Sequence, residues 1–240
     1  MKVTIVFWDI DGTLLTTGKA GVPAWEAAVR EVTGKDFQLS SIRVPGLTDF
    51  QIAARTFDLL GVPPSPDTIA RMVTRYEDGL PASLPLKQGR VLPNVREILE
   101  ALRERSVVRS YLLTGNTRRG ARAKLAHYDL LKYLPDGAFA EDQGSRSSIA
   151  TRALELARRH GPVDDEQIFV IGDTPHDVEC AAAIGARTIA VATGGYTVEE
   201  LSSHRPWRVF EELPPPPEFL KLIDAGRREE GRLKAAPTSA

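Results

Sequence analysis

Apolar and polar positions alternate in blocks along the chain, in a rhythm typical of strands followed by helices. Runs rich in apolar residues predict buried strands at residues 3–7, 107–113, 167–171 and 187–192. Apolar side chains at helical spacing predict helices between them, at residues 94–105, 149–159 and 178–184. This alternation predicts an α/β fold with a Rossmann-like three-layer core, in which helices cover both faces of a mainly parallel sheet.

Residues 16–88 depart from this rhythm, because they contain only helical patterns. Helices are predicted here at residues 24–32, 50–60 and 68–76. We therefore expect a small all-helical domain that is inserted after the first strand. The core domain then comprises residues 1–15 and 89–230, and residues 231–240 form a disordered tail.

Composition limits the classes of function. The chain has 240 residues, 42% of them hydrophobic, and its 31 basic and 32 acidic residues give a formal net charge of −1. This is typical of a soluble globular protein, with no field that attracts nucleic acid or a membrane surface. The N-terminal apolar run meets Asp9 too early for a signal peptide or a membrane span. We expect a cytoplasmic monomer or homodimer, in which the single cysteine, Cys180, packs in the core.

Two carboxylates follow the first predicted strand. Asp9 and Asp11 are separated by one residue, and Gly12 indicates that the chain turns there. Unit charges about 4 Å apart repel by roughly 4 kcal/mol at an effective dielectric constant near 20. The pair therefore needs a cation, a proton or a catalytic role. The alternative is a surface turn, in which Asp and Gly are common.

Two further strands also end in polar residues. Thr114 and Asn116 follow the second apolar run, and Asp173 and Asp177 follow the third. Ligands of open parallel sheets bind beyond the carboxyl ends of the strands, so we expect these groups to converge with Asp9. Carboxylate oxygens are the ligands that Mg²⁺ prefers. The sequence therefore predicts a magnesium site formed by the three aspartates of this group.

The ordered motifs Asp-x-Asp-Gly-Thr, Thr-Gly-Asn and Gly-Asp-x-x-x-Asp resemble the haloacid dehalogenase superfamily of phosphotransferases, over residues 3–195. The resemblance implies that Asp9 is the nucleophile that forms a phosphoaspartate, and that Asp11 is the acid/base. It also implies that the Asp11 carbonyl joins the other aspartates around Mg²⁺. The residues expected to bind the phosphoryl group are Gly12, Thr13, Thr114, Gly115 and Asn116.

One position departs from the family pattern. The family places a lysine before the helix that leads to the last motif, but no lysine occurs between Lys132 and Lys221. Arg146 stands about where that lysine belongs, and a guanidinium can neutralise the same charges. The alternative is a solvent-facing arginine. Lys124 is the second candidate, although its position in a helix favours a surface role.

The helical insertion lies where many family members carry a cap, which excludes water and selects the substrate. Thr48 and Asp49 resemble part of a cap loop that faces the catalytic aspartates in phosphoglycolate-phosphatase-like members. Asp49 is interpreted equally well as the N-cap of the following helix. Lys19 and Arg43 are candidates for contacting a substrate carboxylate or second phosphate, but surface roles are favoured.

The sequence thus favours a Mg²⁺-dependent phosphatase that acts on a small phosphorylated metabolite, with phosphoglycolate as one candidate. A phosphomutase of the same superfamily uses the same acids and returns the phosphoryl group to a sugar. A non-catalytic regulatory protein on this fold is the alternative from a different class. Its mark is the loss of a metal ligand or of the nucleophile, and both are present in this sequence.

Overall fold

A parallel sheet forms the centre of the molecule. The computed structural model describes residues 2–142 and 144–233. The strands of the sheet are β1 (Val3–Trp8), β4 (Val108–Leu113), β5 (Gly137–Ala138), β6 (Val163–Gly172), β7 (Arg187–Val191) and β8 (Arg208–Phe210). Their spatial order is β5-β4-β1-β6-β7-β8, and each neighbouring pair is parallel. The carboxyl ends of these strands therefore share one edge, with β1 near its centre.

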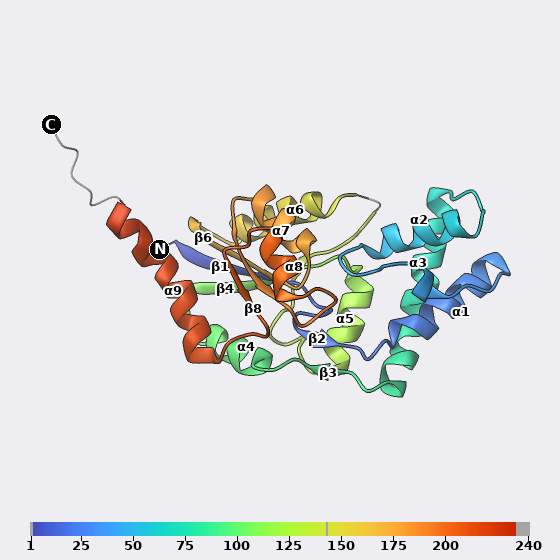
Figure 1. Cartoon of the computed structure of the whole chain (residues 1–240), viewed down its shortest axis with the longest axis horizontal. Helices are drawn as coiled ribbons and strands as arrows, with labels where there is room; N and C mark the ends of the chain where they lie inside the picture. The colour runs from blue at the N-terminus through green and yellow to red at the C-terminus, as the bar shows by residue number, and fades with distance from the viewer. Residues whose placement is uncertain (1, 143, 234–240) are drawn as a thin grey trace.

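Helices cover both faces of this sheet, as the sequence predicted (Figure 1). One face is covered by α6 (Arg146–Arg159) and α7 (Pro175–Ala183). The other face is covered by α4 (Val95–Arg103), α5 (Arg118–His127) and α9 (Pro216–Leu233). Strand β1 is buried throughout because its alternate residues face the two layers: Phe7 packs on the α6 side and Trp8 on the α4 side. The predicted three-layer α/β fold is confirmed.

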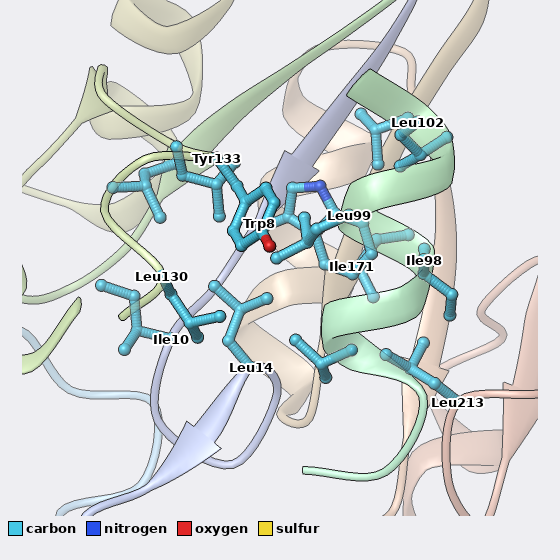
Figure 2. Packing of buried hydrophobic residues seen from close by; sticks show 14 of the residues in the cluster. Trp8, Ile10, Leu14, Ile98, Leu99, Leu102, Leu130, Tyr133, Ile171 and Leu213 are labelled. Carbon is cyan, nitrogen blue, oxygen red and sulfur yellow. The ribbon is translucent and has the colours of Figure 1, made fainter. Parts of the chain in front are cut away.

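Trp8 organises the core on the α4 side of the sheet. Its ring stacks on that of Phe219 from α9, with the centroids 5.7 Å apart. Leu99 of α4 and Tyr133 belong to the same buried cluster (Figure 2). The indole Nε1 of Trp8 donates a hydrogen bond to Ser110 Oγ at 3.4 Å, so the one polar atom of the ring has a partner. This packing fixes the end of β1 immediately before Asp9.

The helical insert follows β1 and has a hydrophobic core of its own. It contains α1 (Gly21–Thr33), α2 (Asp49–Leu59), α3 (Pro66–Ser83) and the 3₁₀ turns Leu39–Ser41 and Leu84–Leu86. Trp25 is buried in this core, and its Nε1 donates to Thr56 Oγ1 at 3.2 Å. Figure 1 shows the insert at one end of the molecule, beyond the carboxyl edge of the sheet. The predicted domain limits at 15/16 and 88/89 stay a prediction.

Several short strands and one short helix were not predicted from the periodicity of the sequence. Strands β2 (Leu15–Thr16) and β3 (Arg90–Val91) form an antiparallel ribbon where the insert leaves and rejoins the core. Strand β8 and helix α8 (Val198–Ser203) were also not predicted, because elements this short show too few repeats of a pattern. Helix α9 continues to Leu233, which corrects the expected start of the tail at residue 231. The rest of that tail, residues 234–240, lies outside the described residues.

Two expectations from composition also concern the packing. Cys180 of α7 is fully buried in the cluster on the α6 side, which confirms that it packs in the core. Its thiol donates to the carbonyl oxygen of Arg146 at 3.4 Å. Within residues 2–142 and 144–233, no helix combines the length and the hydrophobicity that a membrane crossing requires.

Truncation of Leu99 tests this account of the core. Leu99 is 2% exposed, so Leu99→Ala leaves a cavity beside Trp8 and should lower the free energy of unfolding by about 2–5 kcal/mol. Leu86→Ala is the matched control, because Leu86 is 77% exposed and its removal should change stability by less than about 0.5 kcal/mol. Urea unfolding followed by tryptophan fluorescence measures both values. Equal losses would contradict the assignment of the core.

Candidate functional site

Asp9 lies at the centre of the carboxyl edge of the sheet. Its backbone N–H donates to the carbonyl oxygen of Ile171 at 3.0 Å, which extends the pairing of β1 with β6 by one residue. The side chain is 5% exposed, and its Oδ1 atom has no hydrogen-bond partner among the described residues. The nearest cationic atom to Oδ1 is Nη2 of Arg146, at 3.9 Å. A buried carboxylate oxygen without a partner is costly, so this atom marks a place where a cation would be stabilising.

Asp173 and Asp177 approach Asp9 from the end of β6. Each of the three carboxylates offers an oxygen that lies within 4.8 Å of the others. The hydroxyl of Thr13 donates to Asp173 Oδ1 at 3.1 Å, and the backbone N–H of Thr174 donates to Asp177 Oδ2 at 3.0 Å. These bonds orient the carboxylates, and Oδ1 of Asp177 accepts a further hydrogen bond from Nη2 of Arg146. The donor set consists of carboxylate oxygens, which fits a hard divalent cation.

Glycines on two loops make room for the Asp173 carboxylate. A Cβ atom at Gly12 would lie 2.4 Å from Asp173 Oδ2, and Gly12 has a φ of +83°, which favours glycine. A Cβ atom at Gly194 would lie even closer to the same oxygen, so a side chain there would displace Asp173. The Thr193 hydroxyl donates to the Gly12 carbonyl and joins the two loops. Sequence reasoning missed Gly194, although two adjacent glycines directly after a predicted strand were a usable signal.

Arg146 begins helix α6 and points into the cluster of carboxylates. Its Nη2 lies 2.5 Å from Asp177 Oδ1 and 3.9 Å from Asp9 Oδ1. Burial alone would lower the pKa of Arg146, but the charges of Asp177 and Asp9 outweigh it and raise that pKa. The alternative of a solvent-facing arginine is wrong, because Arg146 is 7% exposed. A permanent positive charge therefore lies among the acids.

One guanidinium does not neutralise three buried carboxylates. Burial, together with the charge of Asp177, raises the pKa of Asp9 to about 7, although Arg146 and the Thr114 hydroxyl oppose the shift. Burial and the charge of Asp9 also raise the pKa of Asp173 well above its ordinary value. The protein alone therefore favours a proton in this cluster near neutral pH. A divalent cation would replace that proton and allow the carboxylates to ionise.

Lys124 is buried, and the expected surface role is wrong. Its Nζ donates to Asp11 Oδ2 at 2.5 Å and to Asn116 Oδ1 at 2.6 Å. Burial would lower the pKa of Lys124, but the charge of Asp11 and other neighbours raises it. The sequence held a signal, because Lys124 follows Ala121 by three residues and precedes Tyr128 by four, on the same helix face. The helical insert covers this face, which the helical pattern alone does not reveal.

The loop after β4 places Asn116 between two other site residues. Its Nδ2 donates to Asp11 Oδ2 at 2.9 Å and to the Thr114 hydroxyl at 2.8 Å. A Cβ atom at Gly115 would lie 2.9 Å from Nη1 of Arg146 and 2.9 Å from the carbonyl oxygen of Leu47. Glycine at this position thus allows core and insert to approach each other. Residues predicted after β1 and after β4 thus belong to one hydrogen-bond network, in which Asn116 joins Asp11 to Thr114.

Asp49 joins the helical insert to the core. The N-cap of α2 is Thr48, which forms a capping box with Gln51, so the interpretation of Asp49 as the N-cap is wrong. Asp49 instead accepts a hydrogen bond from the backbone N–H of Thr117 at 2.9 Å and donates its own N–H to Gly115 O at 3.0 Å. Burial raises the pKa of Asp49 to about 6, against the opposing effects of Lys124 and the Thr117 N–H. These bonds close one side of the site.

A cavity of about 440 Å³ lies between the insert and the sheet. Eight of the residues selected from the sequence line it: Asp9, Asp11, Gly12, Asp49, Gly115, Asn116, Arg146 and Asp173. Four do not border it, namely Thr13, Thr48, Thr114 and Asp177. Each of these four is hydrogen-bonded to a residue that lines the cavity. Lys19 borders the cavity, whereas Arg43 lies over the ring of Tyr196, 4.7 Å from its centroid.

Comparisons with known proteins agree with this geometry. The sequence model of the haloacid dehalogenase-like hydrolase family matches residues 6–182. A relative from Caldanaerobacter subterraneus subsp. tengcongensis, named "Putative pyrophosphatase PpaX", is 23% identical over 96% of this chain and 99% of its own. A crystal structure described as a predicted phosphoglycolate phosphatase from Haemophilus somnus has a TM-score of 0.69 at 16% identity, covering 92% of this chain and 98% of that one. The structure of CbbY from Rhodobacter sphaeroides in complex with phosphate also has a TM-score of 0.69, at 18% identity, over 88% of this chain and 94% of that one.

Metal binding should stabilise the protein more at pH 8 than at pH 5.5. The pKa of Asp9 is about 7 in the folded protein, against an ordinary value of 3.8 for an aspartate in the unfolded chain. Between pH 3.8 and pH 7 the folded state therefore keeps a proton on Asp9 that the unfolded state has lost. Stability of the metal-free protein therefore falls as pH rises through this range. At pH 8 this proton is mostly lost, so Mg²⁺ does not have to displace it, and saturation at 100 times its dissociation constant should raise the melting temperature by about 5–10 °C.

Scanning calorimetry with Mg²⁺ and with EDTA at both pH values measures this difference. Asp173→Asn should remove most of the shift, because it deletes one carboxylate of the cluster. Asp58→Asn is the control, since Asp58 is exposed on α2 and should keep the full shift. An equal Mg²⁺ effect in all three proteins, or at both pH values, would rule out this cluster as the binding site.

Proposed function

Because the chain belongs to the haloacid dehalogenase-like hydrolase family, we propose that it is a Mg²⁺-dependent phosphatase that hydrolyses small phosphate monoesters through a phosphoaspartate. The observation that carries this proposal is the position of Asp9, which lines the cavity and lies in one cluster with Asp173 and Asp177. A carboxylate at the wall of the cavity is placed to attack a phosphorus atom. The adjacent carboxylates supply the ligands for the metal that this superfamily generally uses.

Asp9 and Asp11 divide the chemistry between them. A carboxylate oxygen of Asp9 forms a bond to phosphorus while the bond from phosphorus to the ester oxygen breaks. Asp11 donates a proton to the departing alkoxide, so the alcohol leaves neutral. Asp11 then takes a proton from water, whose oxygen attacks phosphorus and releases phosphate and the free Asp9 carboxylate. Both residues line the cavity, and Asp11 is the more exposed of the two.

The surrounding groups stabilise the charge of the phosphoryl group. Asp9, Asp173, Asp177 and the Asp11 carbonyl would hold Mg²⁺, which would neutralise charge on the phosphoryl oxygens when bound. Arg146 contributes a fixed positive charge close to Asp9, and its pairing with Asp177 keeps the guanidinium in place. The backbone N–H of Gly115 can donate to the phosphoryl oxygens, since Gly115 borders the cavity, whereas the N–H of Asn116 is donated to Thr114 Oγ1 at 3.2 Å.

The substrate in this proposal is a small phosphorylated metabolite rather than a macromolecule. The helical insert forms one wall of the cavity, which suits a compact substrate. The formal net charge of −1 favours neither nucleic acid nor an anionic membrane as a partner, and a cytoplasmic monomer or homodimer fits these properties. A phosphomutase would differ by its dependence on a sugar bisphosphate activator.

Replacement of the nucleophile tests the phosphoaspartate route. Asp9→Asn should lower kcat for p-nitrophenyl phosphate at least ~10³-fold, because the amide is a poor nucleophile. The variant should remain folded and be more stable than the metal-free parent at pH 8, since one of the repelling buried charges is gone. Asp58→Asn should keep the parental kcat. Activity retained by a folded Asp9→Asn protein would exclude attack by this residue.

Replacement of Lys124 tests how Asp11 is positioned. Lys124→Met keeps the length of the side chain but removes the ion pair with Asp11, so kcat should fall by about 10–100-fold. The pH profile of kcat should also shift, which a merely structural role of Lys124 would not cause. Lys132→Met, at an exposed position of the same region, is the control. An unchanged pH profile together with a raised KM would instead place Lys124 in substrate binding.

A further inference from the structure

The cavity has two walls of different chemistry. Its sheet side presents Asp9, Asp173, Gly115 and Arg146, the groups assigned above to the metal and the phosphoryl group. Its insert side is mainly apolar and is formed by Val22, Trp25, Leu39, Val44, Leu47 and Ile52. The part of a substrate that lies beyond the phosphoryl group must contact this second wall. The chemistry of the insert wall therefore selects the alcohol.

The aromatic residues of the insert wall carry no charge that could pair with an anionic group of a substrate. Trp25 and Tyr76 both border the cavity, and their ring centroids lie 5.0 Å apart. The indole N–H of Trp25 is already donated to Thr56, so the ring has no free donor for a substrate. Burial raises the pKa of Tyr76, which keeps its phenol neutral. Ile52 of α2 is partly exposed and completes an apolar surface beside these rings.

Two of the three cations that border the cavity are paired with acids at its sheet side. Among the described lining residues these cations are Lys19, Lys124 and Arg146. Lys124 is paired with Asp11, and Arg146 with Asp177. Lys19 is an exposed residue, so water competes for its charge. A second anionic group on the substrate, such as a carboxylate or another phosphate, would have to be buried against the apolar wall without a buried cation, which is unfavourable.

We propose that the substrates are phosphate monoesters of uncharged, apolar alcohols, with a ring or a branched hydrocarbon that fills the insert side of the cavity. This inference rests on the proposed phosphatase function and specifies its substrate class. The volume of about 440 Å³ is in the range of pockets that enclose most of a small organic ligand. Phosphoglycolate does not fit this description, because its second group is a carboxylate.

A series of primary alkyl phosphates tests the proposal, since their leaving groups are of similar reactivity. Ethyl, hexyl and cyclohexylmethyl phosphate are compared with phosphoglycolate and inorganic pyrophosphate, by phosphate release at saturating Mg²⁺. We expect kcat/KM for cyclohexylmethyl phosphate to exceed that for ethyl phosphate, and that for phosphoglycolate, by at least about tenfold. The gain should appear mainly in KM, because the ring contributes binding that is the same in ground and transition states.

A pair of variants on helix α2 links this preference to the insert wall. Ile52→Lys places a cation on the wall and should lower kcat/KM for cyclohexylmethyl phosphate at least about tenfold, while phosphoglycolate gains. Leu59→Lys is the matched control, because Leu59 lies on the same helix, is 60% exposed and does not border the cavity. Ile52→Thr provides a milder change, with a smaller loss in the same direction, should the lysine variant fail to fold.

The outcomes separate this inference from the function on which it rests. Equal kcat/KM values across the series, or a preference for phosphoglycolate or pyrophosphate, would overturn the substrate class and leave the phosphatase proposal intact. An unchanged preference in a folded Ile52 variant would overturn the role of the insert wall. Absence of phosphate release from every compound, with Mg²⁺ present, would overturn both proposals together.

Discussion

The arrangement of the site depends on how buried negative charge is balanced at the centre of the sheet edge. Asp9, Asp173 and Asp177 lie so close together that their ionisation is mutually unfavourable, and a single guanidinium offsets only part of this repulsion. Replacing such a charged group by an apolar one would often be neutral or stabilising in a protein without a function there. The retention of three carboxylates, with glycines shaped around one of them, is therefore better explained by a bound cation than by stability.

The fold supplies this balance from elements that are distant in sequence. The acids follow β1 and β6, two neighbouring parallel strands, because strand ends at the same edge bring such residues together. The cations come from helices on opposite faces of the sheet: Arg146 from α6 and Lys124 from α5. Arg146 pairs with Asp177 and lies near Asp9, whereas Lys124 pairs with Asp11. The two charges have separate partners, so each acid of the Asp9 and Asp11 pair has its own electrostatic environment.

The sequence allowed the sheet, its coverage and the acids to be predicted, because each depends on a local pattern. Apolar runs of strand length are followed by Asp9 and Asp173. Because the carboxyl ends of parallel strands share one edge of the sheet, these residues were expected to lie close together. Burial of Lys124 could not be predicted in this way, since it depends on the insert covering one face of α5. The hydrogen bond from Thr117 to Asp49 is also a tertiary contact, and a helix-start pattern could not separate it from capping.

Helix α5 connects the chemistry of the core with the position of the insert. Its N-cap residue, Thr117, donates its N–H to Asp49, and Arg119 forms ion pairs with Glu77 and Asp78 of α3. Arg119 is exposed, so its ion pairs contribute little, whereas the buried bond to Asp49 fixes the start of α2 against the loop after β4. Lys124 lies two turns further along and is enclosed by the same contact surface. The surface of α5 that contacts the insert is thus the one that buries Lys124, the partner of Asp11. The position of the insert wall proposed to select the substrate, and the environment of Asp11, therefore depend on the same contacts between α5 and the insert.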